Sequence, residues 1–225
     1  MGCTVETPKP KRRRKSLPTA RPYGELSAEA KARARDYWRE KGWTWDQWDS
    51  GELTDLFAEV LLEDYGIEVA TRTERLSGGK TIQRPDIFWS LSYCQGDGVS
   101  FTAHPDLEAM AKKNEAIREV MQTVELLEAA GGWEYSPEWS VSIDANGGHA
   151  EFYAYHRANN DEQRVLDELC VAVEAELDQV HKQACRRLEK LGYAEIEYRD
   201  SDEYLEDVLT ANDHYLFTEE GEFDS

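Results

Sequence analysis

The fold expected for this chain is governed by a long stretch, residues 161–191, in which apolar side chains recur every three or four positions. This period places them on one face of an α-helix, so we predict a long helix that ends at Gly192. A similar period predicts a second long helix over residues 105–130, stopped by two glycines. Three shorter helices are expected: one begins after Ser27, one covers residues 51–65, and one begins after Ser201.

Other segments have the period of two that is typical of strands. Residues 86–93 alternate and lead through a glycine-containing loop to residues 99–102. Residues 139–155 predict a hairpin that turns at Asn146 and Gly147, and residues 77–80 predict another turn. These patterns favour an α+β fold, in which an antiparallel sheet built from hairpins packs against two long and about three shorter helices.

Charge divides the 225-residue chain into two parts. The net charge is −20, yet residues 1–22 hold seven basic residues and one acidic residue. Prolines and like charges dominate this segment, so it cannot offset its own ordering entropy. We therefore predict a disordered basic arm over residues 1–22 and a single acidic α+β domain over residues 23–225. The cations assigned to the arm are Lys9, Lys11, Arg12, Arg13, Arg14 and Lys15.

Acidic residues crowd the C-terminal end, where the last 31 residues hold twelve of them and one arginine. Such a surface can attract a basic protein, for example one that normally binds nucleic acid. A plainer alternative is an acidic protein whose charge serves solubility or adaptation to salt. The carboxylates expected to contact a partner are Asp200, Asp202, Glu203, Glu206, Asp207, Glu219, Glu220 and Glu222.

The loop formed by Gln95, Gly96, Asp97 and Gly98 is the sharpest local signal for a ligand site. Flanking glycines permit close approach to Asp97, which could act as a base or as a ligand acceptor oriented by Gln95. The competing interpretation is a turn in which Asp97 bonds to its own loop. His149 would join Asp97 if the two hairpins were neighbours.

Neither a metal nor a cofactor is expected. The four cysteines and five histidines lack the spacing of metal ligands, and no nucleophile stands in a recognisable catalytic motif. No apolar run reaches the ~18 residues of a membrane span. Most of six tryptophans are expected in the core, because their acidic surroundings disfavour stacking on nucleic acid bases. They are Trp43, Trp45, Trp48, Trp89, Trp133 and Trp139.

Three sequence phrases are similar to those of a known family. They are ELSAEAKARARDYWR at residues 25–39, SYCQGDGVSF within residues 85–101, and ANDHYLFTEEG at residues 211–221. The chain resembles a phage- and prophage-encoded family whose members carry these motifs in the same order, some of them labelled antitoxin. In place of the family's short N-terminal strand this chain has the basic arm. The resemblance implies a phage or prophage origin, a single α+β domain and action in the host cytoplasm.

Together these observations favour a non-enzymatic accessory protein. It would bind and modulate a basic host protein or a nucleic-acid enzyme, in host takeover or anti-defence, including mimicry of DNA. Three alternatives stay open: a small enzyme or ligand-binding domain that uses Gln95, Asp97 and His149, a virion or assembly component, and an antitoxin. Contact with nucleic acid is expected only through the arm, contact with membranes is not expected, and the location is expected to be cytoplasmic.

Overall fold

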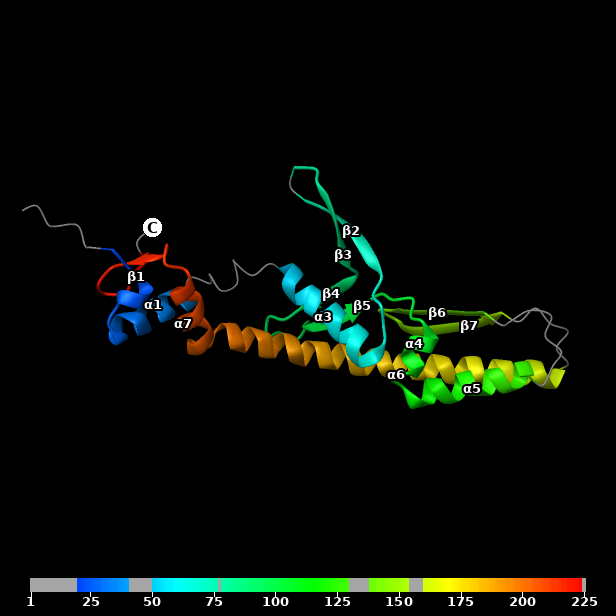
Figure 1. The fold of residues 1–225 in the computed structure, drawn as a ribbon. Helices are drawn as coiled ribbons and strands as arrows, with labels where there is room; N and C mark the ends of the chain where they lie inside the picture. The colour runs from blue at the N-terminus through cyan, green and yellow to red at the C-terminus, as the bar shows by residue number, and fades with distance from the viewer. Residues whose placement is uncertain (1–19, 41–49, 77, 130–137, 154–159, 224–225) are drawn as a thin grey trace, which may run out of the picture. The chain divides into compact units, whose positions relative to one another are not determined.

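The computed structural model describes residues 20–40, 50–76, 78–129, 138–153 and 160–223. Within these residues the chain forms six α-helices and four small two-stranded antiparallel sheets, which confirms the α+β fold (Figure 1). The described residues divide into two compact units. One contains residues 20–40 and 198–223, and the other contains residues 50–197. The single domain expected over residues 23–225 stays a prediction, and each unit is described by itself.

The smaller unit is built from both ends of the described chain. A 3-10 turn, Tyr23–Glu25, precedes helix α1 (Ala28–Glu40), and α7 (Asp202–Ala211) packs with them. Strand β1 (Arg21–Pro22) pairs with β8 (Leu216–Phe217). The core contains Tyr23, Trp38 and Phe217, each with no more than 1% of its surface exposed.

The structure confirms one sequence prediction about this unit and corrects another. Ser27 and Ser201 accept hydrogen bonds from Ala30 and Tyr204, so both serine caps are confirmed. Arg21 and Pro22, which the sequence assigned to the arm, belong to the folded part as strand β1, because Phe217 and Leu216 offer them a partner strand. The six arm cations from Lys9 to Lys15 lie outside the described residues.

The larger unit contains four helices and three hairpins that follow one another along the chain. The helices are α3 (Ser50–Tyr65), α4 (Leu107–Ala111), α5 (Glu115–Ala129) and α6 (Asn160–Arg199), whose last two residues belong to the smaller unit. Strand β2 (Thr71–Arg75) pairs with β3 (Thr81–Pro85), β4 (Ile87–Ser90) with β5 (Gly98–Phe101), and β6 (Glu138–Asp144) with β7 (Gly147–Tyr153). Both predicted turns, at residues 77–80 and at Asn146 and Gly147, join paired strands.

The apolar stripe of α6 forms the centre of the larger core. Val173, Leu177, Val180, Ala184 and Leu188, all expected on its inner face, are buried. The same cluster contains buried residues of α3, α4, α5 and the β4–β5 and β6–β7 hairpins. Trp89 lies at its edge and donates a hydrogen bond from Nε1 to Thr54 Oγ1 at 3.1 Å. Trp89 and Trp139 are half-buried against this core, as expected. Trp43, Trp45, Trp48 and Trp133 lie outside the described residues.

Two helix predictions were wrong in their boundaries. The helix α6 does not end at Gly192 but continues to Arg199. A β-carbon at Gly192 would lie 2.3 Å from Leu91 Cδ1, so this glycine permits close packing instead of ending the helix. The helix expected over residues 105–130 is two helices, because Asn114 Oδ1 accepts a hydrogen bond from the Ile117 amide and caps α5 anew.

No helix in the part of the chain that the structure describes is both long enough and apolar enough to cross a membrane.

We predict that Gly148→Ala destabilises the protein by about 1–3 kcal/mol, because overpacking a well-filled core costs this much. A β-carbon at Gly148 would lie 2.3 Å from Leu177 Cβ and 3.1 Å from the Asp178 nitrogen. The measurement is the free energy of unfolding from denaturant titration. Gly98→Ala is the matched control, because a β-carbon there has nothing within 4 Å. Equal stability of the two variants would show that the β6–β7 hairpin does not approach α6 this closely.

Candidate functional site

The carboxylate of Asp97 is held by a closed set of donors. Its Oδ2 accepts hydrogen bonds from the backbone amides of Ser92 and Cys94, at 2.8 and 2.9 Å. Its Oδ1 accepts from the hydroxyls of Ser90 and Ser92, at 3.1 and 2.9 Å. A further donor comes from outside the loop, since Tyr193 OH on α6 lies 2.5 Å from Oδ2.

These contacts change the proton affinity of both partners. The hydrogen bond from Tyr193 holds the pKa of Asp97 well below its usual range, and the bonds from Cys94 and Ser92 act in the same direction. The same bond raises the pKa of Tyr193 to about 12. Asp97 is therefore a carboxylate and Tyr193 a neutral phenol throughout the physiological range.

This geometry suits an anchor better than a base. Both oxygens of Asp97 accept hydrogen bonds already, and a carboxylate with a depressed pKa is a weak proton acceptor. Asp97 ties the loop after β4 to helix α6, where the rings of Tyr93 and Tyr193 also lie 4.6 Å apart. Tyr93 adopts a φ of +57°, a left-handed conformation that the loop imposes on a residue other than glycine.

The other residues of the predicted loop site do not converge on Asp97. Gln95 and Gly96 are exposed, and Gly98 pairs with Ser90 at the end of the β4–β5 hairpin. A shallow depression of about 400 Å³ adjoins the loop, and its lining residues are uncharged. They are Phe88, Trp89, Ser90, Gly96, Gly98, Val99 and Ser100.

His149 lies far from Asp97 along α6. Its neighbours in β7, Gly148 and Ala150, donate backbone hydrogen bonds to Asp178 and Glu174 of that helix. Asp97 instead bonds to Tyr193, which is 15 residues beyond Asp178. At ~1.5 Å per residue these attachment points are ~22 Å apart. The structure therefore does not assemble the His149–Asp97 pair that the sequence suggested.

Among the described residues, no group of three or more His, Cys, Asp or Glu side chains could hold a metal ion.

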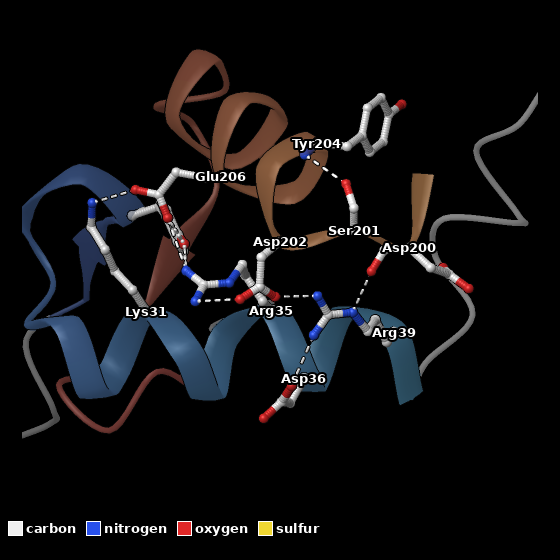
Figure 2. A network of polar contacts seen from close by, with 10 residues as sticks. Lys31, Arg35, Asp36, Arg39, Asp200, Ser201, Asp202, Tyr204 and Glu206 are labelled. Atoms are coloured by element: carbon white, nitrogen blue, oxygen red, sulfur yellow. Dashed lines mark hydrogen bonds and ion pairs between the residues drawn. The ribbon is translucent and has the colours of Figure 1, made fainter. Parts of the chain in front are cut away.

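Several of the C-terminal carboxylates are engaged by cations of the same unit (Figure 2). Glu206 accepts from Lys31 Nζ at 2.8 Å and from Arg35 at 2.9 Å. Asp202 binds Arg35 at 3.2 Å and also binds Arg39. The helix α1 thus supplies a row of cations to α7.

The remaining predicted residues are used in different ways. Glu219 pairs with Arg21 at 3.2 Å. Asp200 and Glu220 accept hydrogen bonds at their backbone oxygens, from Arg39 and Arg33 respectively. In the described part of the chain no basic side chain pairs with the carboxylates that are left, which are those of Glu203, Asp207 and Glu222.

The α1–α7 contacts also shift the pKa values of their members. Lys31 and the Tyr23 hydroxyl lower the pKa of Glu206, and Arg39 and Arg35 lower that of Asp202. Burial, together with the hydrogen bond to Glu206, raises the pKa of Tyr23 to about 12. These carboxylates are therefore structural, and the sequence reasoning missed their partners. The signal was present as the four-residue spacing of Lys31, Arg35 and Arg39.

A second set of carboxylates that the sequence reasoning missed lies on α3. Glu52, Asp55, Glu59 and Glu63 are all exposed and recur at three- or four-residue intervals, so they form one stripe along the helix, which we call the α3 stripe. No lysine or arginine occurs in α3. The pattern was visible as an acidic face opposite the apolar residues Leu53, Phe57 and Leu61.

The chain matches a known family over most of its length. Residues 50–220 match a family model described as a domain of unknown function (DUF8835). The matched region includes α3 and the Asp97 loop and begins after α1. No curated protein and no solved structure shows detectable similarity to the chain.

We predict that Tyr193→Phe weakens the dependence of stability on acid pH. The depressed pKa of Asp97 contributes stability that is present above its ordinary value, ~3.9, and is lost as pH falls through the folded-state pKa. Removing the Tyr193 hydroxyl brings the pKa of Asp97 back toward its ordinary value, so the contribution of Asp97 to stability shrinks. The measurement is the melting temperature from pH 7 down to about pH 1.5, where the two folded-state pKa values act. Tyr198→Phe is the control, and an unchanged pH profile in Tyr193→Phe would contradict the anchoring role.

We predict that Glu206→Gln lowers the free energy of unfolding by about 1 kcal/mol, a modest value because solvent partly screens this pair. The exposed Glu203→Gln, three residues away on the same helix, should change it by much less. The stabilisation by Glu206 is present above its ordinary pKa and is lost as pH falls through the lowered one. Denaturant titration of both variants at neutral pH is the measurement, and equal effects would show that the network in Figure 2 adds nothing.

Proposed function

We propose that this chain, which belongs to the DUF8835 family, is a non-enzymatic phage or prophage accessory protein that binds a basic host protein through the α3 stripe. The observation that carries the proposal is the exposure of four carboxylates on a helix without a single basic residue. The C-terminal carboxylates support it less, because Asp202, Glu206 and Glu219 already pair with cations.

The stripe carries an electrostatic cost within the helix. Like charges four residues apart destabilise a helix by ~0.2–0.5 kcal/mol for each pair, and Asp55, Glu59 and Glu63 form two such pairs. Burial of Leu53, Phe57 and Leu61 on the opposite face offsets this repulsion. A bound cationic surface would relieve it, so the energy released on binding adds to the attraction between the two proteins.

The spacing of the stripe suits a linear cationic groove. Carboxylates four residues apart in a helix are displaced by ~6 Å along its axis. In a nucleic acid the phosphate charges follow at ~3.4 Å along one strand. A row of carboxylates along a helix can partly replace such a phosphate backbone in a protein groove that binds nucleic acid. This is the form of DNA mimicry that the chain supports.

The non-enzymatic part of the proposal is supported by Asp97, the residue best placed in sequence to act as a base. Its oxygens are occupied by donors from Ser90, Ser92, Cys94 and Tyr193, and its pKa is lowered. The phage or prophage part is supported by the sequence phrases at residues 25–39, 85–101 and 211–221.

The test is affinity capture from the host followed by measurement with the purified partner. The variant is Asp55→Asn, Glu59→Gln and Glu63→Gln combined. The matched control is Glu115→Gln, Glu119→Gln and Glu125→Gln, which removes the same charge from exposed positions on α5. We expect the α3 variant to raise the dissociation constant by about tenfold or more and the control variant to leave it nearly unchanged.

Salt gives an independent check. Raising ionic strength from 0.1 to 1 M shortens the Debye length from ~10 to ~3 Å, so the affinity of the native protein should fall steeply. Both triple variants must keep the melting temperature of the native protein within a few degrees. Equal capture by the two variants, or an affinity that does not change with salt, would overturn the proposal.

A further inference from the structure

The β2–β3 hairpin has the opposite charge to the rest of the chain. Four basic residues stand on or between its strands, at Arg72, Arg75, Lys80 and Arg84, against the single acid Glu74. In Figure 1 the hairpin extends from the body of the larger unit, and its turn lies away from α3. A protein with a net charge of −20 therefore carries a compact basic projection.

The two faces of the hairpin differ. On one face the cross-strand pairs are Thr73 with Gln83 and Arg75 with Thr81, and all four residues are exposed. Gln83 Nε2 donates to Thr73 Oγ1 at 2.9 Å. This open face presents hydroxyls, an amide and a guanidinium, with no carboxylate among them.

On the other face, the charged side chains contact partners within the same unit. Arg72 and Arg84 stand directly opposite each other, a pairing of like charges that destabilises a sheet. Arg84 binds Glu74 at 3.1 Å, and Arg72 stacks its guanidinium 4.2 Å from the centre of the Phe88 ring. The one acid of the hairpin is thus neutralised on the covered face.

The cations near the turn have no such partner. Among the described residues, neither Arg75 nor Lys80 forms an ion pair. Gly78 and Gly79 adopt φ values of +99° and +82°, and no atom lies within 4 Å of a β-carbon built on Gly78. The turn can therefore approach another backbone closely, with a cation on each side.

The hairpin is longer than the distance over which charges interact strongly in salt solution. This length matters because the carboxylates of the larger unit would repel an anionic ligand. Five residues per strand span ~17 Å, whereas the Debye length is ~10 Å at 0.1 M salt. The turn thus lies more than one Debye length from the base of the hairpin, measured along its strands.

We infer that the β2–β3 hairpin is a nucleic-acid-binding ribbon that enters the major groove of duplex DNA, with Arg75 and Lys80 on the phosphates and the Thr73–Gln83 face toward the base edges. A two-stranded ribbon fits the major groove, which is ~12 Å wide. Threonine hydroxyls, a glutamine amide and an arginine are groups that contact phosphates and base edges. The narrow, deep major groove of duplex RNA does not admit such a ribbon.

The experiment separates the hairpin from the N-terminal arm. The parent protein is the full chain with Lys9, Lys11, Arg12, Arg13, Arg14 and Lys15 changed to glutamine. In this parent we compare Arg75→Gln with Lys80→Gln against the matched control Lys112→Gln with Lys113→Gln, which removes two exposed cations elsewhere. Binding to a fluorescent DNA duplex of about 20 base pairs is followed by anisotropy at several salt concentrations.

We expect the parent and the control to bind and the hairpin variant to bind about tenfold more weakly at low salt. Each phosphate contact contributes ~−0.9 to the slope of log affinity against log salt, so the hairpin variant should lose a slope of about 2. Amide chemical shifts of Thr73, Arg75 and Thr81 should move in the parent when duplex DNA is added. A third variant, Gln83→Ala, should keep the salt slope and weaken binding only slightly.

Competition identifies the ligand class. Duplex DNA should displace the probe better than a single strand, duplex RNA or polyglutamate at equal charge. Failure of the parent to bind, equal losses in the hairpin and control variants, or preference for any of the other three polyanions would overturn the inference. Since this surface lies on residues other than the α3 stripe, its failure leaves the proposed protein contact to be judged by its own variants.

Discussion

The larger unit depends on the burial of one apolar stripe along α6. Val173, Leu177, Ala184 and Leu188 belong to a cluster that also contains residues of α3, α4, α5 and two hairpins. A fully buried leucine or valine contributes ~1.5–3 kcal/mol, and helices gain most of their stability from such packing. The hairpins are too small to be stable alone, so this stripe is what allows them to exist as ordered elements.

The polar residues that flank the stripe are used for docking. Asp178 and Glu174 accept hydrogen bonds from backbone amides of β7, and Glu176 accepts one from Asn114. Tyr193 reaches the Asp97 loop from the same helix. An unpaired amide near the core would cost ~1–3 kcal/mol. Three acidic residues in the middle of α6 therefore hold neighbouring elements in place, although in sequence they looked like surface charge.

Charge outside these docking contacts is divided among surfaces of different character. In the smaller unit Lys31, Arg35 and Arg39 compensate Asp202 and Glu206. In the larger unit the α3 stripe is exposed and acidic, and the β2–β3 hairpin is basic. A net charge of −20 describes none of these three situations. What a partner would encounter depends on which carboxylates have a cation within reach, and that differs from one element to the next.

The helical period placed the buried face of α6 correctly, and the glycine turns joined the strands that they were expected to join. Helix ends were less well predicted, since Gly192 was taken as a stop although Leu91 packs against it. Asn114, an unremarked capping residue, divided the other long helix. The pairing of His149 with Asp97 failed because the two attach to α6 at distant points.

The amino-acid sequence alone determined the types of the elements and their apolar faces, because both depend on neighbours within a few positions. It also determined the total charge, because that is a sum over all residues. Only the tertiary structure decided which charged side chains form ion pairs or hydrogen bonds within the protein. Glu206 and Lys31 are separated by 175 residues yet lie 2.8 Å apart, and no local period encodes such a distance. The roles of Asp97, Glu206 and Arg75 differ because folding brought donors or cations to the first two and left the third without an ion-pair partner among the described residues.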